Sequence, residues 1–349
     1  MNMTKKYRVL GLMSGTSLDG IDLVICTLKK NPKWEFKIDK SKTLKYCNYW
    51  KKTLSNLHTK NKFLISKIDI KYGEFLAKNI NKFLKKENVD LIASHGHTIF
   101  HQPNKKITLQ IGNGQTIANI TRIKTINNFR NLDVSLNGQG APLVPIGDLH
   151  LFTDYKYCIN LGGFANISIK EKNTIIAFDI CPVNIVLNKI SEQLFMEFDK
   201  NGSIAKKGKL IPKLLQKLNE LSYYKNKYPK SLSREWVENY IYPLLKKEYR
   251  LEDMLNTFCE HIAIQIGKLL TDKSVFFTGG GVLNKYLMSR ITHYTKSKIV
   301  IPNNKIINFK EALIFSFLGV LKLRNEINCL KSVTGAVIDN CGGEINNPM

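Results

Sequence analysis

The sequence contains no apolar run that approaches the ~18 to 20 residues needed to span a bilayer. The apolar stretch in the opening residues, MNMTKKYRVLGLMSG, is too short for a signal peptide. We therefore expect a cytoplasmic protein with no membrane partner. The seven cysteines show no paired short spacing, so the pattern indicates neither a zinc site nor a disulfide framework.

Arginine is scarce, because only seven of the 53 basic residues are Arg and the remaining 46 are Lys. With 28 acidic residues the net charge is +25, a balance typical of proteins that bind polyanions. Nucleic-acid sites favour Arg and concentrate charge on one face, whereas Lys is scattered here from Lys5 to Lys331. Lys, Asn and Ile, the residues of A/T-rich codons, are all abundant. We therefore attribute the charge to genome composition and expect no nucleic-acid partner, with polyanion binding as the alternative.

Size and composition indicate an ordinary folded protein. The 349 residues correspond to one large or two medium domains, and 43% of them are hydrophobic and 23% charged. Apolar strand-like runs alternate with helical periodicity, and a polar glycine turn follows nearly every strand, a pattern typical of the α/β class. The chain is therefore long enough to build a substantial core.

Two strand, glycine turn, strand units lie about 150 residues apart and suggest two related halves. Pro182 can occupy the first turn of a helix, which places Asp179 where a strand ends and a helix begins. The Lys-, Asn- and Ser-rich residues 201–235 are expected to be a mobile surface excursion. The expected strands are 7–13, 21–28, 90–98, 156–163, 164–170, 174–180 and 274–279, and the expected helices are 62–86, about 251–270 and about 283–291.

The first turn, within GLMSGTSLDGID (11–22), concentrates hydroxyls, glycines and two carboxylates in a few residues. Backbone amides and hydroxyls suit phosphate oxygens, and an aspartate nearby suits Mg²⁺ or its waters. The alternative is a tight hairpin that uses turn residues for their own geometry. The residues expected to contact a phosphate-bearing cofactor are Gly15, Thr16, Ser17, Leu18, Asp19, Gly20, Ile21 and Asp22, with Asp19 holding Mg²⁺ directly or through water.

Two further glycine turns follow strands, at Gly162 and Gly163 and at Gly279, Gly280 and Gly281. Bare backbone at such a turn lets a base or phosphate pack closely, although close packing of the turn itself would also explain each one alone. Neither string fits the GxGxxG spacing or the P-loop. If a nucleotide binds, it therefore does so through another architecture.

Taken together, these segments resemble the anhydro-N-acetylmuramic acid kinase family of the sugar kinase, Hsp70 and actin superfamily. The resemblance implies an α/β fold of two ribonuclease H-like lobes, about 1–140 and 141–349, with ATP and Mg²⁺ in the cleft between the lobes and part of the C-terminal end packing back on the first lobe. It also implies a homodimer. The motifs that carry it are GLMSGTSLDGID (11–22), SHGHTIFHQP (94–103), LQIGNGQTIA (109–118), NFRNLDVSLNGQGAPLVP (128–145), INLGGFANIS (159–168), FDICPVN (178–184), FTGGGVLN (277–284), KEALIFSFLG (310–319) and SVTGA (332–336).

The resemblance implies the ATP-dependent phosphorylation of 1,6-anhydro-N-acetylmuramic acid with hydrolytic opening of its ring, a step of peptidoglycan recycling. That reaction needs a carboxylate base near the anomeric carbon, and the family match assigns it to Asp179. A carboxylate that merely stabilises a helix N-terminus is the alternative. Glu311 is expected near the sugar, or else as an exposed helix charge. The other expected substrate contacts are His95, Arg130, as partner of the lactyl carboxylate, and Gln139.

One run departs from the family pattern. The family's usual Asp-Thr-Gly-Pro-Gly-Asn is here Asp-Ile-Cys-Pro-Val-Asn, at 179–184. If the family glycines allow backbone approach or a positive φ, Cys181 and Val183 would obstruct the site. The alternative function is therefore a catalytically impaired descendant that binds nucleotide or muropeptide sugar without turnover.

Overall fold

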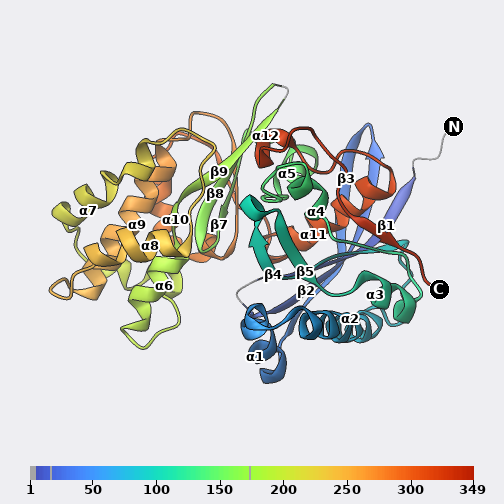
Figure 1. Cartoon of the computed structure of the whole chain (residues 1–349). Helices are drawn as coiled ribbons and strands as arrows, with labels where there is room; N and C mark the ends of the chain where they lie inside the picture. Colours follow the sequence, from blue (N-terminus) through green and yellow to red (C-terminus); the bar gives the residue numbers. More distant parts are fainter. Residues whose placement is uncertain (1–4, 16–17, 173) are drawn as a thin grey trace. The chain divides into compact units, whose positions relative to one another are not determined.

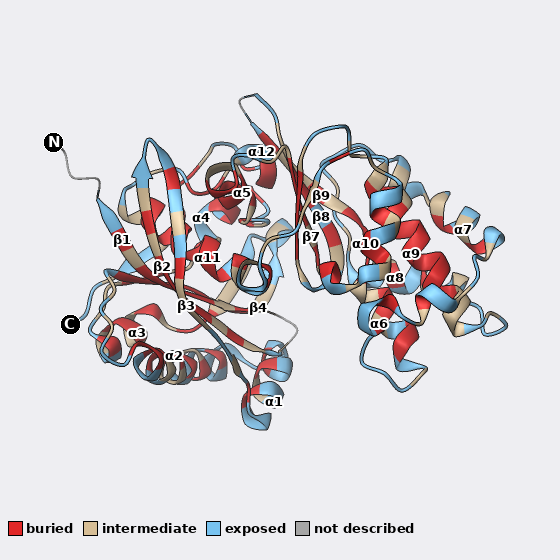
Figure 2. Ribbon diagram, turned by 180° about the vertical axis from the view of Figure 1, so that it is seen from behind, coloured by how far each residue is buried: buried red, intermediate tan, exposed pale blue. Residues whose placement is uncertain are grey.

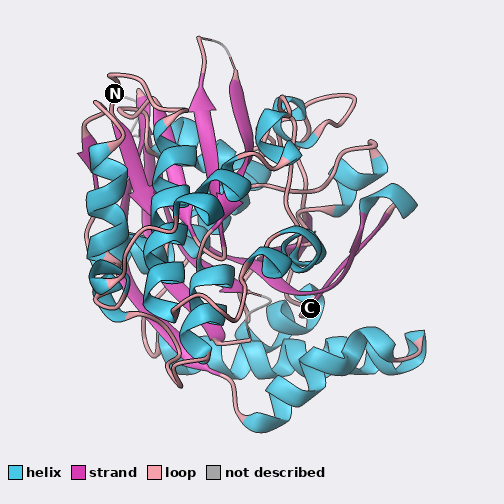
Figure 3. Cartoon of the chain, turned by 90° about the vertical axis from the view of Figure 1, so that its left-hand side faces the viewer, coloured by secondary structure: helices cyan, strands magenta, loops and turns pink. Residues whose placement is uncertain are grey.

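The computed structural model describes residues 5–15, 18–172 and 174–349. The chain divides into two compact units, the first formed by Met1–Leu151 with Phe309–Met349 and the second by Phe152–Asn308 (Figure 1). Each unit contains one β-sheet, and helices and strands occur in both (Figure 3). The chain is therefore an α/β protein built from two units, as the sequence predicts.

The sheet of the first unit has the strand order β12-β6-β4-β1-β2-β3, with β5 paired to β4. The β1–β2–β3 meander is antiparallel, whereas β4 runs parallel to β1 and β6 parallel to β4. The hairpin predicted at 7–28 is confirmed, with Leu10 opposite Ile25. The strands are β1 (Lys6–Ser14), β2 (Gly20–Asn31), β3 (Lys33–Lys45), β4 (Leu91–Gln102), β5 (Ile107–Ile111), β6 (Thr125–Asn127) and β12 (Glu344–Asn346).

The sheet of the second unit repeats this arrangement in the order β11-β10-β7-β8-β9. Here β7, β8 and β9 form the antiparallel meander, β10 runs parallel to β7, and β11 runs parallel to β10. The shared order is that of the ribonuclease H-like fold, so the two related halves expected from the sequence are confirmed. The strands are β7 (Tyr157–Leu161), β8 (Phe164–Lys170), β9 (Ile175–Pro182), β10 (Val275–Thr278) and β11 (Ile299–Val300).

The helices of the first unit cover its sheet with apolar side chains. Helix α2 begins after Asn61, whose side chain accepts a hydrogen bond from the N–H of Leu64, and it buries one stripe of side chains that includes Tyr72 and Leu76. Helix α11 packs on β1 at Gly11, where a Cβ would lie 2.1 Å from the carbonyl oxygen of Ala312. The helices are α1 (Asn48–Asn56), α2 (Lys62–Leu84), α3 (Gly114–Thr121), α4 (Asn131–Ser135), α5 (Pro145–Leu151), α11 (Asn304–Leu323) and α12 (Lys331–Thr334).

The core of the second unit centres on α9, which Figure 2 shows largely in the colour of buried residues. Phe258, Cys259 and Ile262 of this helix are fully buried. Its strong apolar periodicity is why the sequence predicts it. The helices of this unit are α6 (Asn184–Glu192), α7 (Pro212–Asn219), α8 (Arg234–Tyr240), α9 (Leu251–Gly267) and α10 (Lys285–His293).

The segment 201–235 differs from its prediction as a mobile surface excursion. It contains α7 and several 3-10 turns, and Leu214, Leu218 and Tyr223 are buried. The signal for α7 is present as Pro212 at the first turn followed by leucines at helical spacing. The many polar residues between them mask this short pattern.

Two further positions differ from expectation. Pro182 ends β9 instead of starting a helix, and α6 starts at Asn184, so Asp179 lies inside β9. The structural boundary falls at 151–152 instead of 140–141, whereas the place of residues 309–349 in the first unit agrees with the expectation that part of the C-terminal end packs back on it. The reason is that α5 is tied to α11 by a buried ion pair between Asp148 and Lys310, 2.7 Å apart.

Among the described residues, no helix is long and apolar enough to cross a membrane.

Candidate functional site

The turn between β1 and β2 presents two neighbouring carboxylates in the first unit. Asp19 is exposed, and Asp22 is half-buried and accepts a hydrogen bond of 2.5 Å from Thr43 Oγ1 on β3. Burial raises the pKa of Asp22, the Thr43 bond opposes this, and the charge of Asp19 raises the pKa further. The two carboxylates therefore lie close enough to interact, and a cation between them would relieve their repulsion.

The other residues of this turn differ in whether protein packing already explains them. A Cβ on Gly20 would lie 2.4 Å from the carbonyl oxygen of Leu44, so glycine is required here by the approach of β2 to β3. Ile21 is buried in the core. The Gly15 carbonyl accepts a hydrogen bond from the N–H of Leu18, whose φ is +59°. Thr16 and Ser17 lie outside the described residues, and nucleotide contact by any of the turn residues remains a prediction.

The donor set of the turn fits Mg²⁺ as kinases hold it. Mg²⁺ is usually bound through one or two carboxylates, with phosphate and water oxygens completing its shell. Within the described part of the chain, no group of three or more His, Cys, Asp or Glu side chains is placed to enclose a metal. Asp19 offers an exposed carboxylate and Asp22 a second one nearby, which suits an ion that arrives with a nucleotide.

A buried chain of hydroxyls supports the start of this turn, and no local pattern in the sequence points to it. Ser14, the last residue of β1, lies 2.6 Å from the Tyr46 hydroxyl and 2.8 Å from His97 Nδ1, and Tyr46 in turn contacts the Tyr72 hydroxyl. Burial lowers the pKa of His97 to about 4, so its ring is neutral at physiological pH. The network links β1, β4 and α2 and fixes where the turn departs from the sheet.

Arg130 and His95 form a second constellation in the first unit. Arg130 Nε and Nη2 lie 3.2 and 2.9 Å from His95 Nε2, and Nη1 donates to the Gly140 carbonyl over 2.6 Å. Because a guanidinium can only donate, Nε2 is the acceptor and the imidazole proton lies on Nδ1, 3.0 Å from the Gly96 carbonyl. Burial and the Arg130 charge hold the pKa of His95 well below 6.5.

Both His95 nitrogens therefore have protein partners, and the residue acts by fixing Arg130. Direct contact of His95 with a substrate remains a prediction. Burial lowers the pKa of Arg130 to about 10, opposed first by the charge of Glu311, so the side chain stays cationic at neutral pH. A fixed, half-buried guanidinium is suited to a planar carboxylate partner.

Glu311 lies on α11 and is exposed to solvent. Desolvation by the surrounding protein raises its pKa, while the charges of Arg130 and Lys310 lower it and the charge of Asp22 raises it. Glu311 is thus coupled electrostatically to both constellations of the first unit. Its expected place near the sugar is compatible with this position and remains a prediction.

Asp133 organises the loop that carries Gln139 and Gly140, although its sequence motif gives no sign of this role. The carboxylate is fully buried; its Oδ1 accepts hydrogen bonds from one thiol, one hydroxyl and one amide, and its Oδ2 accepts the Gly140 N–H at 2.7 Å. Gln139 is exposed, and its N–H donates to the Thr334 carbonyl. The three side-chain donors are Cys329 Sγ (3.0 Å), Thr334 Oγ1 (2.8 Å) and Asn340 Nδ2 (2.8 Å).

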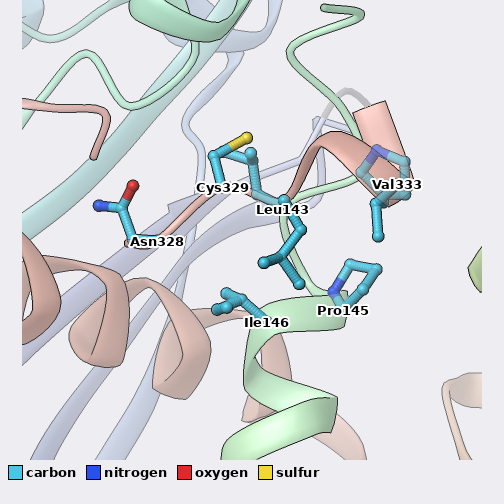
Figure 4. A pocket seen from close by; sticks show the side chains of 8 residues that line it. Leu143, Pro145, Ile146, Asn328, Cys329 and Val333 are labelled. Carbon is cyan, nitrogen blue, oxygen red and sulfur yellow. The ribbon is translucent and has the colours of Figure 1, made fainter. Parts of the chain in front are cut away.

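Since the Gly140 carbonyl also binds Arg130, Asp133 connects the C-terminal segment to the guanidinium. A small gap lies beside this loop, lined by residues that include Leu143, Ile146 and Val333 (Figure 4). It has no room for a water molecule. The gap is a packing feature and offers no ligand site.

Asp179 lies on β9 of the second unit, opposite Asn166 of β8. Its side chain is half-buried, and its Oδ2 accepts the N–H of Leu232 over 2.9 Å. Burial raises the pKa of Asp179, and the Leu232 bond opposes this. Such a carboxylate takes up a proton more readily than an exposed one, which suits a general base.

The two residues that stand where the resemblance implies glycines are packed inside the second unit. Cys181 and Val183 are both fully buried in the core of the second unit. Val183 has a negative φ of −130°, so this position does not take the positive φ that favours glycine. A β-bulge between Ala165 and Asn166 sets the register of this stretch. The chain therefore turns both side chains inward.

The turn at Gly162 and Gly163 caps helix α6. The Gly163 carbonyl accepts the N–H groups of Val183 at 2.8 Å and Ile185 at 3.2 Å, and the Gly162 carbonyl accepts that of Asn184 at 3.2 Å. These are among the N–H groups that a helix start leaves without intrahelical partners. The two glycine carbonyls thus accept the N–H groups at the start of α6. Nucleotide contact by the two glycines remains a prediction.

The turn at Gly279–Gly281 divides into packed and open glycines. A Cβ on Gly279, whose φ is +85°, would lie 2.7 Å from the Leu161 carbonyl oxygen, and one on Gly281 would lie 2.7 Å from Leu161 Cβ. A Cβ on Gly280 would meet no atom of the described residues within 4 Å. Protein packing explains the first and last glycine, whereas Gly280 leaves bare backbone open to a ligand.

Comparison with known proteins matches the anhydro-N-acetylmuramic acid kinase family model to residues 7–347. An anhydro-N-acetylmuramic acid kinase of Francisella tularensis subsp. novicida is 35% identical, covering 98% of each chain. One from Sulfurovum sp. is 32% identical over 95% of this chain and 96% of that protein. A solved structure, component A of (R)-2-hydroxyglutaryl-CoA dehydratase from Acidaminococcus fermentans, matches with a TM-score of 0.47 and 13% identity, covering 89% and 96% of the two chains. From the near full-length family match, the chain belongs to the anhydro-N-acetylmuramic acid kinase family.

Proposed function

We propose that the chain transfers the terminal phosphoryl group of ATP to O6 of 1,6-anhydro-N-acetylmuramic acid while water opens the anhydro bridge. The C1–O6 bond breaks, the water oxygen bonds to C1, and O6 bonds to phosphorus, giving N-acetylmuramic acid 6-phosphate and ADP. The observation that carries this proposal, beyond family membership, is the half-buried carboxylate of Asp179, whose Oδ2 is held by the Leu232 N–H.

Asp179 would act as the base that removes a proton from the attacking water. Burial raises the pKa of Asp179 above the usual value of an aspartate, which makes its carboxylate a stronger base. The hydrogen bond on Oδ2 would hold the carboxylate while the water is activated. The proton would remain on Asp179 until the product leaves.

The first unit would bind the two negatively charged ends of the substrates. Asp19 and Asp22 would hold Mg²⁺, which supplies positive charge to the phosphate groups. Arg130, fixed by His95 and the Gly140 carbonyl, would pair with the lactyl carboxylate of the sugar. Glu311 and Gln139 would contact the sugar nearby.

The proposed setting follows from the same reaction. The sugar is a fragment of peptidoglycan, so the enzyme would serve peptidoglycan recycling in the cytoplasm. A homodimer is part of this proposal. Sedimentation of the purified chain would test the dimer directly.

The direct test is ADP release by the purified protein given Mg-ATP and the 1,6-anhydro sugar, with glucose as the control sugar. We expect ADP and one phosphorylated sugar, formed together, and only background ADP with glucose. ATP binding without turnover of the anhydro sugar, or equal ADP release with glucose, would contradict the proposal.

A further inference from the structure

The segment Tyr223–Leu232, here called the Asp179 strap, contacts Asp179 at three atoms. The N–H of Leu232 donates to Asp179 Oδ2 over 2.9 Å, and the N–H of Asp179 donates to the Lys230 carbonyl over 3.2 Å. The Tyr223 hydroxyl donates to the Asp179 carbonyl over 2.6 Å. Backbone and side chain of one strand residue are thus bound by a single short segment, some 50 residues away in sequence.

The strap is itself anchored to the second unit. The Tyr223 ring is 6% exposed and packs 5.4 Å from the Trp236 ring. Lys230 Nζ lies 4.7 Å from the centre of the Tyr223 ring and 5.7 Å from that of Phe178, and the Tyr228 ring stacks on Phe178 at 5.7 Å. These cation–π and ring contacts tie the strap to Phe178 of β9 and to Trp236 of α8.

We propose that the Asp179 strap is a positioning element, in which the Leu232 N–H fixes Oδ2 and leaves Oδ1 as the oxygen that takes the proton. Within the described residues, no donor is bound to Oδ1. The proposal rests on the base role of Asp179 under the proposed function. It gives a function to a segment whose sequence predicts only a mobile surface.

The strap also lowers the pKa of Asp179 through the Leu232 hydrogen bond. A hydrogen bond to a carboxylate favours the ionised form, so the Leu232 N–H counteracts the burial that raises the pKa of Asp179. The titratable neighbours are Cys181 on the same strand and Tyr223 and Lys230 on the strap. Burial raises the pKa of both Cys181 and Tyr223, so both stay neutral where a carboxylate titrates. Lys230 stays cationic across that range.

The test removes the N–H of residue 232, which donates to Asp179 Oδ2, and in the ester variant keeps the leucine side chain. Replacing Leu232 by its α-hydroxy acid converts the amide to an ester, and Leu232→Pro removes the same donor by ordinary mutagenesis. Leu232→Ala is the matched control, because it shortens the side chain but keeps the N–H. The measurement is kcat/KM for the anhydro sugar against pH. In the ester and proline variants we expect the acid limb of the kcat/KM profile, which reports the pKa of the base, to move to higher pH. In Leu232→Ala it should stay at the wild-type position.

An ester variant whose acid limb coincides with that of the wild type would overturn the proposal, as would an equal shift in Leu232→Ala. The ester variant decides if Leu232→Pro fails to fold. Titration of the Asp179 carboxyl carbon by NMR, assigned by its loss in Asp179→Asn, gives the same comparison without turnover. A wild-type enzyme that makes no product would contradict the proposed function, while this titration still decides on the strap.

Discussion

Asp179 combines a functional requirement with a cost to folding. Because burial raises its pKa above the ordinary value of 3.8, the folded chain binds this proton more tightly than the unfolded chain does. Folding stability therefore falls as the pH rises from about 3.8 through the folded-state pKa, and the loss is complete above it. This is the opposite of an aspartate held by an ion pair.

The variant Asp179→Asn is expected to separate these effects. Its kcat should fall by about 10²- to 10⁴-fold, the usual contribution of a general base. Its melting temperature should exceed that of the wild type at pH 7, with the difference vanishing below about pH 4. Thermal unfolding of both proteins from pH 3 to 8 measures this, and an Asn variant that is less stable at pH 7 would refute the assignment of the raised pKa.

Arg130→Lys tests whether the guanidinium recognises the lactyl carboxylate. Lysine keeps the charge but lacks the fork that bonds His95 and Gly140 at once. We expect kcat/KM for the anhydro sugar to fall roughly 10- to 100-fold, as for the loss of a hydrogen bond to a charged group. The control substrate is 1,6-anhydro-N-acetylglucosamine, which lacks the lactyl group. An equal loss on both sugars would argue against carboxylate recognition.

At the scale of elements, the Gly279–Gly281 turn makes two opposite predictions. Gly279→Ala should destabilise the fold by about 1–3 kcal/mol, because φ is +85° and the Leu161 carbonyl lies 2.7 Å from the new Cβ. Gly280→Ala should leave the melting temperature unchanged, since no atom in the described part of the chain lies within 4 Å of the new Cβ, yet weaken ATP binding measured by calorimetry. Unaltered ATP affinity in a folded Gly280→Ala protein would exclude this turn as a nucleotide contact.

Elements with long periodic patterns were predictable from the sequence. The apolar residues of α2 and α9 recur at helical spacing, and those of the β1–β2 hairpin form short β-branched runs. Each pattern follows from burying one face of the element, so the element can be predicted from the sequence. The Asp179 strap and the hydrogen bonds around Asp133 could not be predicted, since they join residues that are far apart in the chain. Asp133, for example, binds Asn340, and no local pattern encodes a pairing over 207 residues.

The residues of the candidate site likewise fall into those that a local motif predicts and those that only contacts between distant residues bring together. Asp179, Arg130 and the glycine turns stand in motifs whose residue types suggest chemistry by themselves. The supporting groups, such as Tyr46 and Tyr72 beneath Ser14, look like ordinary core residues in the sequence. Only the fold shows that their hydroxyls meet.

At the scale of the whole molecule, two units with the same strand order carry different parts of the proposed chemistry. The first holds the carboxylates of the β1–β2 turn and Arg130, and the second holds Asp179. Their common order explains why the sequence shows two similar hairpins, and the return of residues 309–349 to the first unit explains why a single cut in the sequence could not divide the chain.

The central claim is that Asp179 activates the water that opens the anhydro ring during phosphoryl transfer. The most direct measurement supplies Mg-ATP and 1,6-anhydro-N-acetylmuramic acid in water enriched in heavy oxygen and analyses the sugar by mass spectrometry, with Asp179→Asn in parallel. The account predicts a 6-phosphate that carries one heavy oxygen at the anomeric position, formed about 10²- to 10⁴-fold more slowly by the variant. A phosphorylated sugar without the heavy atom, or one formed equally by Asp179→Asn, would contradict it.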